Sequence, residues 1–247
     1  MRKALPFPFV IGHRGSPRAA PENTLASFRQ AARDGARWVE FDVSLTSDGR
    51  AVIFHDDDLD RTSDGTGPLA ETPFDALRSL DAGSWFGPAF RGEPVPTLEE
   101  ALELFLREGL AFNMEIKPDR GREVETAQVA LAIARDCWPA SAPPPLISSF
   151  SRASVATAKE VQPGWPRDLL FDRLTDDWNE VGAQLDLVSF GANHQHLTAE
   201  QVAAMHEPGY GVMAYTVNDV DRARTLKTWG VDGIFTDIPA EMLKAFK

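Results

Sequence analysis

The sequence predicts a closed (β/α)8 TIM barrel, an α/β fold in which eight parallel strands alternate with helices. Eight short apolar runs alternate along the chain with stretches whose apolar residues recur every three or four positions, the spacing typical of surface helices. The runs are apolar almost throughout, as parallel strands covered by helices are. A chain of 247 residues also has about the length that one such barrel needs. An open, doubly wound parallel sheet is the weaker alternative.

The predicted strands are short apolar runs, most of which end in polar residues. In chain order they cover 9–13, 37–43, 110–117, 144–150, 167–172, 185–190, 210–217 and 231–237. Seven helices are predicted between these strands, and several of them open on Ser, Thr or Asp and close at Gly. They cover 24–36, 97–109, 123–137, 151–161, 175–184, 198–209 and 220–230.

Two neighbouring segments interrupt this alternation. Residues 43–55 place a Ser-Asp-Gly turn between two apolar runs, which predicts a small β-hairpin after the second strand. Residues 56–96 are long for a strand-to-helix connection and contain a short helix candidate at 72–80. Ordered insertions of this length are often lids or binding loops. We therefore expect one domain over residues 1–247, with a lid-like insertion at about 56–96.

The composition argues against nucleic acid and anionic membranes as partners. The chain carries 25 Lys and Arg against 37 Asp and Glu, a formal net charge of -12. No apolar run approaches the roughly 20 residues of a membrane span. The apolar stretch at the start of the chain is short and is interrupted by Pro6 and Pro8, so we do not expect a signal peptide. Cys137 has no cysteine partner for an intramolecular disulfide. We expect a cytoplasmic protein with a small-molecule substrate and no stable membrane association, whose oligomeric state stays open.

Acidic residues end two neighbouring predicted strands. Glu40 and Asp42 are two positions apart, and on a strand this spacing points both carboxylates to one face. Glu115 ends the next barrel strand, so three carboxylates are expected at one barrel mouth. They would repel one another strongly unless a cation lay among them. Oxygen ligands without Cys suit a hard ion, which predicts one divalent cation, Mg2+ or Ca2+.

Two histidines and two positive side chains lie near this predicted ion. His13 ends the first strand and His55 ends the hairpin, and two imidazoles at one mouth can act as acid and base. Arg14 suits a pair of phosphoryl oxygens, and Lys117 adds a point charge. Together they describe a phosphate ester site. The remaining histidines are interpreted as structural: His194, His196 and His206.

Five blocks of the sequence stand in a specific order and spacing. They are HRG with PENT, EFDVSLTSDGRAVIFHDDDLDRTSDGTG, NMEIKP, YTVN and GVDGIFTDIP, and they span Gly12 to Pro239. This series resembles the signature of the glycerophosphodiester phosphodiesterases, of the short, single-domain cytoplasmic bacterial type. The resemblance implies that the family's functional residues fall on seven positions of this chain: His13 and His55 as catalytic histidines, Glu40, Asp42 and Glu115 as metal ligands, and Arg14 and Lys117 as phosphate-binding residues.

The reaction that the resemblance implies is metal-dependent hydrolysis of a glycerophosphodiester to sn-glycerol 3-phosphate and an alcohol. His13 is expected to accept the proton of the attacking oxygen and His55 to protonate the leaving alcohol, although the exchanged roles fit equally well. Arg14 and Lys117 are expected to stabilise charge on the phosphoryl oxygens. The attacking oxygen is either water or the substrate's own glycerol hydroxyl. Tyr215 stands where the family commonly carries Trp, so it is expected to line the glycerol pocket and to add a hydroxyl there.

Two alternative functions use the same barrel. The first is phospholipase-like cleavage of lysophospholipids, with Trp85, Phe86 and Phe90 of the insertion as contacts for the acyl chain. We favour the simpler interpretation that these rings pack the insertion onto the barrel. The second alternative is a non-catalytic phosphate-ester-binding protein. Such a protein is expected to lack a histidine or a metal carboxylate, and all five are present.

Overall fold

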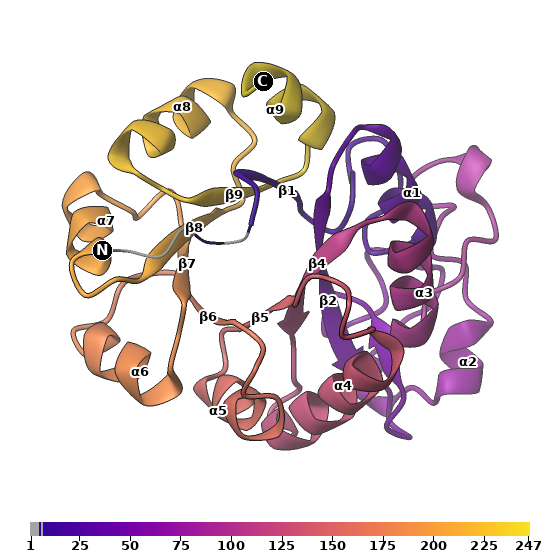
Figure 1. Ribbon diagram of the computed structural model, residues 1–247. Coiled ribbons are helices and arrows are strands. Elements are labelled where there is room, and N and C mark those ends of the chain that lie inside the picture. The colour runs from indigo at the N-terminus through magenta and orange to yellow at the C-terminus, as the bar shows by residue number, and fades with distance from the viewer. Residues whose placement is uncertain (1–4, 6) are drawn as a thin grey trace.

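The chain folds into a closed barrel of parallel strands surrounded by helices (Figure 1), as seen in a computed structural model that describes residues 5 and 7–247. Strand β1 (Val10–Gly12) pairs in parallel with both β2 (Trp38–Leu45) and β9 (Gly233–Thr236), and these two pairings close the ring. An open sheet is thereby excluded. The signal-peptide argument falls partly on residues 1–4 and 6, which lie outside the described residues.

The strand order around the ring follows the chain, since each strand pairs with the next barrel strand. The other barrel strands are β4 (Ala111–Ile116), β5 (Leu146–Ser149), β6 (Arg167–Phe171), β7 (Ser189–Asn193) and β8 (Gly211–Tyr215). The surrounding helices are α1 (Leu25–Arg33), α3 (Leu98–Glu108), α4 (Glu123–Cys137), α5 (Arg152–Val161), α6 (Trp178–Leu185), α7 (Ala199–His206), α8 (Val220–Trp229) and α9 (Pro239–Ala245). The predicted TIM barrel is confirmed.

Two elements differ from the prediction. Strand β7 begins at Ser189, four residues later than predicted, because the helix before it continues to Leu185 and ends at Asp186 with a left-handed φ of 51°. Leu185 is buried at the end of this helix and Leu187 in the connection that follows. The apolar residues predicted to begin the strand therefore belong to the helix end and the connection. Helix α9, which completes the eighth strand-helix unit, was not predicted. Its seven residues give too short an apolar pattern, although Met242 is fully buried.

Alternation along β2 and β4 separates the two faces of the sheet. On β2, Phe41 packs toward the helices, where it contacts Phe28, Phe105 and Phe112 with ring centroids 5.4–6.2 Å apart. The residues on either side of Phe41, Glu40 and Asp42, face the barrel interior, because successive side chains on a strand point to opposite sides. Inside the barrel, a second apolar cluster contains the following buried residues: Ile11, Trp38, Ala111, Leu146, Met213 and Phe235. Several of them come from strand beginnings, which leaves the carboxyl ends of the strands for polar side chains.

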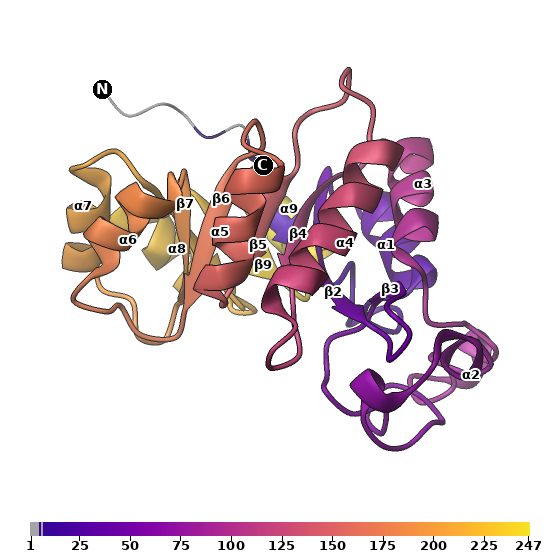
Figure 2. The same cartoon turned by 90° about the horizontal axis from the view of Figure 1, so that it is seen from below.

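The predicted hairpin and insertion are both present after β2. Strand β3 (Ala51–Ile53) pairs with β2 in antiparallel register, with Val43 opposite Ile53. The insertion that follows contains η1 (Leu69–Glu71), α2 (Phe74–Arg78) and η2 (Pro88–Phe90), and it projects beyond the barrel (Figure 2). At its centre is a small apolar core that the insertion shares with the hairpin, formed by these buried residues: Val52, Phe54, Leu59, Leu69, Leu77, Ala82 and Val95.

The three aromatic residues of the insertion pack against one another. Phe86 makes edge contacts with Trp85 at 5.7 Å and with Phe90 at 5.4 Å between ring centroids. The Trp85 indole N–H donates to the carbonyl of Ala82, which fixes the ring although 41% of the residue is exposed. None of the three lines the cavity at the barrel mouth. Their ring contacts lie within the insertion, so these contacts show neither the expected packing onto the barrel nor an acyl-chain site at this cavity.

Candidate active site

Three carboxylates from two adjacent strands converge inside the barrel. Glu40 and Asp42 are buried on β2, and Asp42 lies opposite Glu115 in the parallel register of β2 with β4. One oxygen from each of the three lies within 4.8 Å of the others, close enough for all three to hold one ion. The predicted acidic triad is therefore formed.

The electrostatics of the triad fit a bound cation. Burial, together with the neighbouring carboxylates, raises the pKa of Glu40 well above its ordinary value and that of Glu115 to about 8. Burial also opposes ionisation of Asp42, but the positive charges of Arg14, His55 and Lys117, together with a hydrogen bond from Asn23, outweigh it and hold the pKa of Asp42 below its ordinary value. Glu40 Oε1 is buried without a hydrogen-bond partner. An orphaned buried carboxylate oxygen beside two others is the donor set that a hard divalent cation takes.

A tight turn after β1 places Arg14 beside the triad. Arg14 has a left-handed φ of 51°, and Gly15, the next residue, has a φ of 91°. A Cβ at Gly15 would lie 2.4 Å from Ser27 Oγ, so only glycine fits there. The turn lets the Arg14 backbone N–H donate to Glu40 Oε2 at 3.0 Å, while Arg14 Nε lies 3.2 Å from Asp42 Oδ2.

His13, in the same turn, is oriented by a carboxylate from the other end of the chain. His13 Nδ1 lies 2.7 Å from Asp237 Oδ1. Asp237 Oδ2 accepts in turn from the amide of Asn218 at 2.6 Å, so this carboxylate is fixed on both oxygens. Because Nδ1 is occupied, His13 Nε2 is the nitrogen left toward the triad, 3.9 Å from Glu40 Oε2.

His55 is held by a second carboxylate and contacts a lysine. Its Nδ1 lies 2.5 Å from Asp56 Oδ1, and its Nε2 lies 3.2 Å from Lys117 Nζ. Burial, with the nearby positive charges of Arg14 and Lys117, lowers the pKa of His55 although Asp42 and Asp56 oppose this. The structure thus supplies two imidazoles, each with one nitrogen held by an aspartate.

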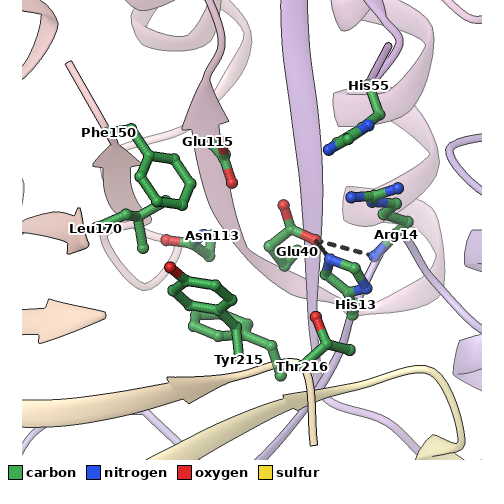
Figure 3. A pocket seen from close by; sticks show the side chains of 11 residues that line it. His13, Arg14, Glu40, His55, Asn113, Glu115, Phe150, Leu170, Tyr215 and Thr216 are labelled. Carbon is green, nitrogen blue, oxygen red and sulfur yellow. Dashed lines mark hydrogen bonds and ion pairs between the residues drawn. The ribbon is translucent and has the colours of Figure 1, made fainter. Parts of the chain in front are cut away.

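These groups line one cavity of about 260 Å3 at the barrel mouth (Figure 3). On one side lie His13, Arg14, Glu40 and His55, and on the other lie Phe150, Leu170, Tyr215 and Asn113. Glu115 lies between the two sides. A charged wall facing an aromatic and aliphatic wall is the arrangement expected around a small molecule with one anionic end and one less polar end.

Comparisons with known proteins show the family to which the chain belongs. The family model described as the glycerophosphoryl diester phosphodiesterase family matches residues 13–241. The chain belongs to this family. A phosphodiesterase from Oleispira antarctica, solved in complex with the product sn-glycerol 3-phosphate, is 40% identical, with a TM-score of 0.94 over 97% of this chain and 96% of that chain. A glycerophosphodiester phosphodiesterase from Caldanaerobacter subterraneus is 32% identical over 95% of this chain and 96% of its own length. One from Bacillus subtilis is 30% identical over 93% and 83%.

Two residues expected from the family pattern need a more exact placement. Lys117 is not among the residues that line this cavity; its Nζ contacts His55 Nε2, and it lines two adjoining hollows together with Asp57. Tyr215 does line the cavity, and its hydroxyl donates to the carbonyl of Phe171 at 2.8 Å. The hydroxyl that Tyr215 adds is therefore hydrogen-bonded to the backbone, and the aromatic ring of Tyr215 lines the cavity.

Several cavity and supporting residues were not predicted as part of the site. Asp237 ends the last predicted strand and Asp56 directly follows the predicted hairpin, and each holds a histidine. Phe150 and Leu170 line the cavity from the ends of β5 and β6, and their strand-end position was the signal that could have found them. His206 contacts Asp232 at 3.2 Å, and none of the three histidines interpreted as structural lines this cavity.

Proposed function

We propose that this chain is a glycerophosphodiester phosphodiesterase that hydrolyses its substrate to sn-glycerol 3-phosphate and an alcohol at the barrel mouth. The observation that carries the proposal is the convergence of His13, His55, Glu40 and Glu115 on one cavity, with Asp42 completing the acidic triad beside it. The product bound by the Oleispira antarctica relative has the size and polarity that such a cavity suits. We assign the whole activity to one barrel domain over residues 1–247.

Substrate binding uses the two different walls of the cavity. The Arg14 guanidinium offers paired donors to the phosphoryl oxygens, and Lys117 adds positive charge beside His55 Nε2. The glycerol moiety lies against the rings of Phe150 and Tyr215, whose centroids are 5.7 Å apart in an edge contact. This orientation places the phosphodiester between the two histidines.

Proton transfer is assigned to the two imidazoles. His13 Nε2 accepts the proton of the attacking oxygen as its bond to phosphorus forms, and His55 donates a proton to the alcohol oxygen as its bond to phosphorus breaks. The attacking oxygen is that of water or of the substrate's glycerol hydroxyl. In the second case a cyclic phosphate forms first, and water then opens it. Arg14 stabilises the charge that gathers on the phosphoryl oxygens.

Substrates with different leaving groups can distinguish the roles of the two histidines. A glycerophosphodiester of a nitrophenol releases an anion that needs no proton, so His55→Ala should retain much more activity on this substrate than on glycerophosphocholine. His13→Ala should lose activity on both, by roughly 10²- to 10⁴-fold. The opposite pattern would exchange the two roles.

Glu40, Asp42 and Glu115 are proposed to hold one divalent cation, Mg2+ or Ca2+. When bound, such an ion polarises a phosphoryl oxygen and lowers the pKa of an oxygen that attacks beside it. Arg14 keeps its place next to the ligands through its backbone bond to Glu40, so it can hold the phosphate at the same point.

The test of the function is turnover by the metal-stripped and restored protein. We expect a chelator to remove activity and either Mg2+ or Ca2+ to restore release of glycerol 3-phosphate from glycerophosphocholine, glycerophosphoethanolamine or glycerophosphoglycerol. Full activity in the stripped protein would refute the metal assignment, and no release from any of the three would refute the substrate class. A lysophospholipid in the same assay tests the phospholipase alternative, and binding without turnover would indicate the non-catalytic one.

The net charge of the chain supports a proposal for its localisation and its partners. The net charge of -12 disfavours nucleic acid and anionic membranes as partners, and we assign the chain to the cytoplasm with a small-molecule substrate. In the described part of the chain, no helix combines the length and apolar character needed to cross a bilayer.

A further inference from the structure

Arg61, in the insertion, makes four hydrogen bonds to two carboxylates. Its Nε and Nη2 donate to Asp56 at 2.5 and 2.9 Å, and its Nη1 and Nη2 donate to Glu22 at 2.8 Å each. Glu22 belongs to the turn between β1 and α1, whereas Asp56 follows the hairpin. One guanidinium therefore joins the insertion to the first strand-helix connection.

Each of these carboxylates also contacts a residue that lines the cavity. Asp56 Oδ1 lies 2.5 Å from His55 Nδ1, and Glu22 Oε1 accepts from Arg14 Nη1 at 2.7 Å. The result is a continuous chain of alternating charge from His55 to Arg14, with Arg61 at its centre. Without Arg61, Asp56 would keep only its contact with His55, and Glu22 would keep only its contact with Arg14.

We infer that Arg61 is a positioning residue for the proposed reaction, because it fixes Asp56 behind His55 and Glu22 behind Arg14. The inference rests on the proposed function for its kinetic consequence. The planar fork of a guanidinium matches two carboxylates at once, which a lysine ammonium does not. The bonds from Arg61 also hold the pKa of Asp56 below its ordinary value, so Asp56 stays ionised as the acceptor for His55.

The alternative is that Arg61 only anchors the insertion, and Arg78 provides a matched control for it. Arg78 also lies in the insertion and donates to both oxygens of Glu100, at 3.0 and 2.5 Å, and to the carbonyl of Val95. It ties the insertion to α3 without contacting His55, Arg14 or their carboxylates. A purely structural role predicts equal kinetic effects at the two arginines.

The kinetic experiment compares Arg61→Gln, Arg61→Lys and Arg78→Gln in the metal-loaded enzyme. We expect Arg61→Gln to lower kcat by roughly 10- to 100-fold, the loss typical when a supporting partner of a site residue is removed. Arg61→Lys should recover only part of the loss, and Arg78→Gln should keep kcat within about 2-fold of the original. Adding Asp56→Asn to Arg61→Gln should reduce kcat by less than the product of the single effects.

A second measurement is independent of turnover. In the metal-free protein, nitrogen NMR of His55 should report a proton on Nδ1, and Arg61→Gln should shift the tautomer population toward Nε2–H while Arg78→Gln leaves it unchanged. Unchanged kcat and an unchanged His55 tautomer in Arg61→Gln would overturn the inference, as would equal effects of the two arginine variants. If the original protein hydrolyses none of the diesters, the proposed function fails, and the tautomer comparison alone decides whether Arg61 positions His55.

Discussion

At the scale of single residues, the site is defined by what lies behind each histidine. His13 is backed by Asp237, which a neutral amide from Asn218 supports, while His55 is backed by Asp56, which bonds to a guanidinium. In both pairs the aspartate occupies Nδ1, which makes Nε2 the nitrogen for proton transfer, and His55 Nε2 also lies 3.2 Å from Lys117 Nζ. Each imidazole is therefore held in a fixed orientation, with Nδ1 as the nitrogen that donates to the aspartate.

Asp237→Asn should lower kcat strongly without unfolding the protein. An amide in place of the carboxylate can donate to His13 Nδ1 and so favour the tautomer with a proton on Nε2, which cannot accept another. We expect a loss of roughly 10²- to 10⁴-fold in kcat. Steady-state kinetics and circular dichroism measure the two effects, with the exposed Asp221→Asn on α8 as control. A variant with normal kcat would show that Asp237 does not orient His13.

Asp168, in the barrel interior, makes stability depend on pH. Its carboxyl is fully buried, accepts from the Ser189 hydroxyl, and leaves Oδ2 without a partner. Burial raises the pKa of Asp168 to about 7. A carboxyl whose folded pKa is above its unfolded value of about 4 destabilises the fold progressively as pH rises from 4 through 7.

Asp168→Asn should remove this dependence. At pH 4 the variant and the original protein should have similar free energies of unfolding, and above pH 7 the variant should be more stable by up to ~4 kcal/mol. Urea unfolding of both proteins across this pH range, with a chelator present, measures the difference. A difference that stays constant with pH would contradict the prediction.

At the scale of elements, the insertion is a separately packed unit that delivers site residues. Its core is distinct from those of the barrel, and its connections to the barrel include the hairpin and the Arg78 bonds to Glu100. Helix α3, which follows it, is fixed at its start by a capping box in which Thr97 and Glu100 exchange hydrogen bonds. We therefore expect that the insertion can be destabilised while the barrel stays folded.

Leu77→Ala should loosen the insertion selectively. Leu77 is fully buried in the insertion core, and such a truncation costs ~2–5 kcal/mol where the site cannot collapse. Amide hydrogen exchange should accelerate over residues 56–96 and remain slow in β4 and β5. Equal acceleration throughout the chain would mean that insertion and barrel unfold as one unit.

At the scale of the whole molecule, a net charge of -12 surrounds a site meant for an anionic substrate. The local charges of Arg14 and Lys117, and the proposed ion among the carboxylates, reverse that field where the phosphate binds. The same carboxylates repel one another without an ion, so metal binding and stability are coupled.

Metal binding should therefore raise the midpoint temperature of thermal unfolding, Tm. At 100 times its Kd an ion adds ~2.7 kcal/mol, which corresponds to a rise of roughly 5–10 °C for a chain of this size. Glu115→Gln should abolish most of the rise while stabilising the metal-free protein at neutral pH, because it removes a buried carboxyl whose pKa is about 8. Calorimetry with and without Mg2+ or Ca2+ measures both. An unchanged rise in this variant would remove Glu115 from the ligands.

The sequence by itself determined the eight strands, the hairpin and the pairing of Glu40 with Asp42, because these depend on periods of two and of three to four residues that are local to the chain. Only the tertiary structure decided which residues support the site. Asp237 is 224 positions from His13, and Arg61 is 39 from Glu22, so no local pattern relates them. Closure of the barrel between β1 and β9, and the fold of the insertion over β2, bring these partners within hydrogen-bonding distance.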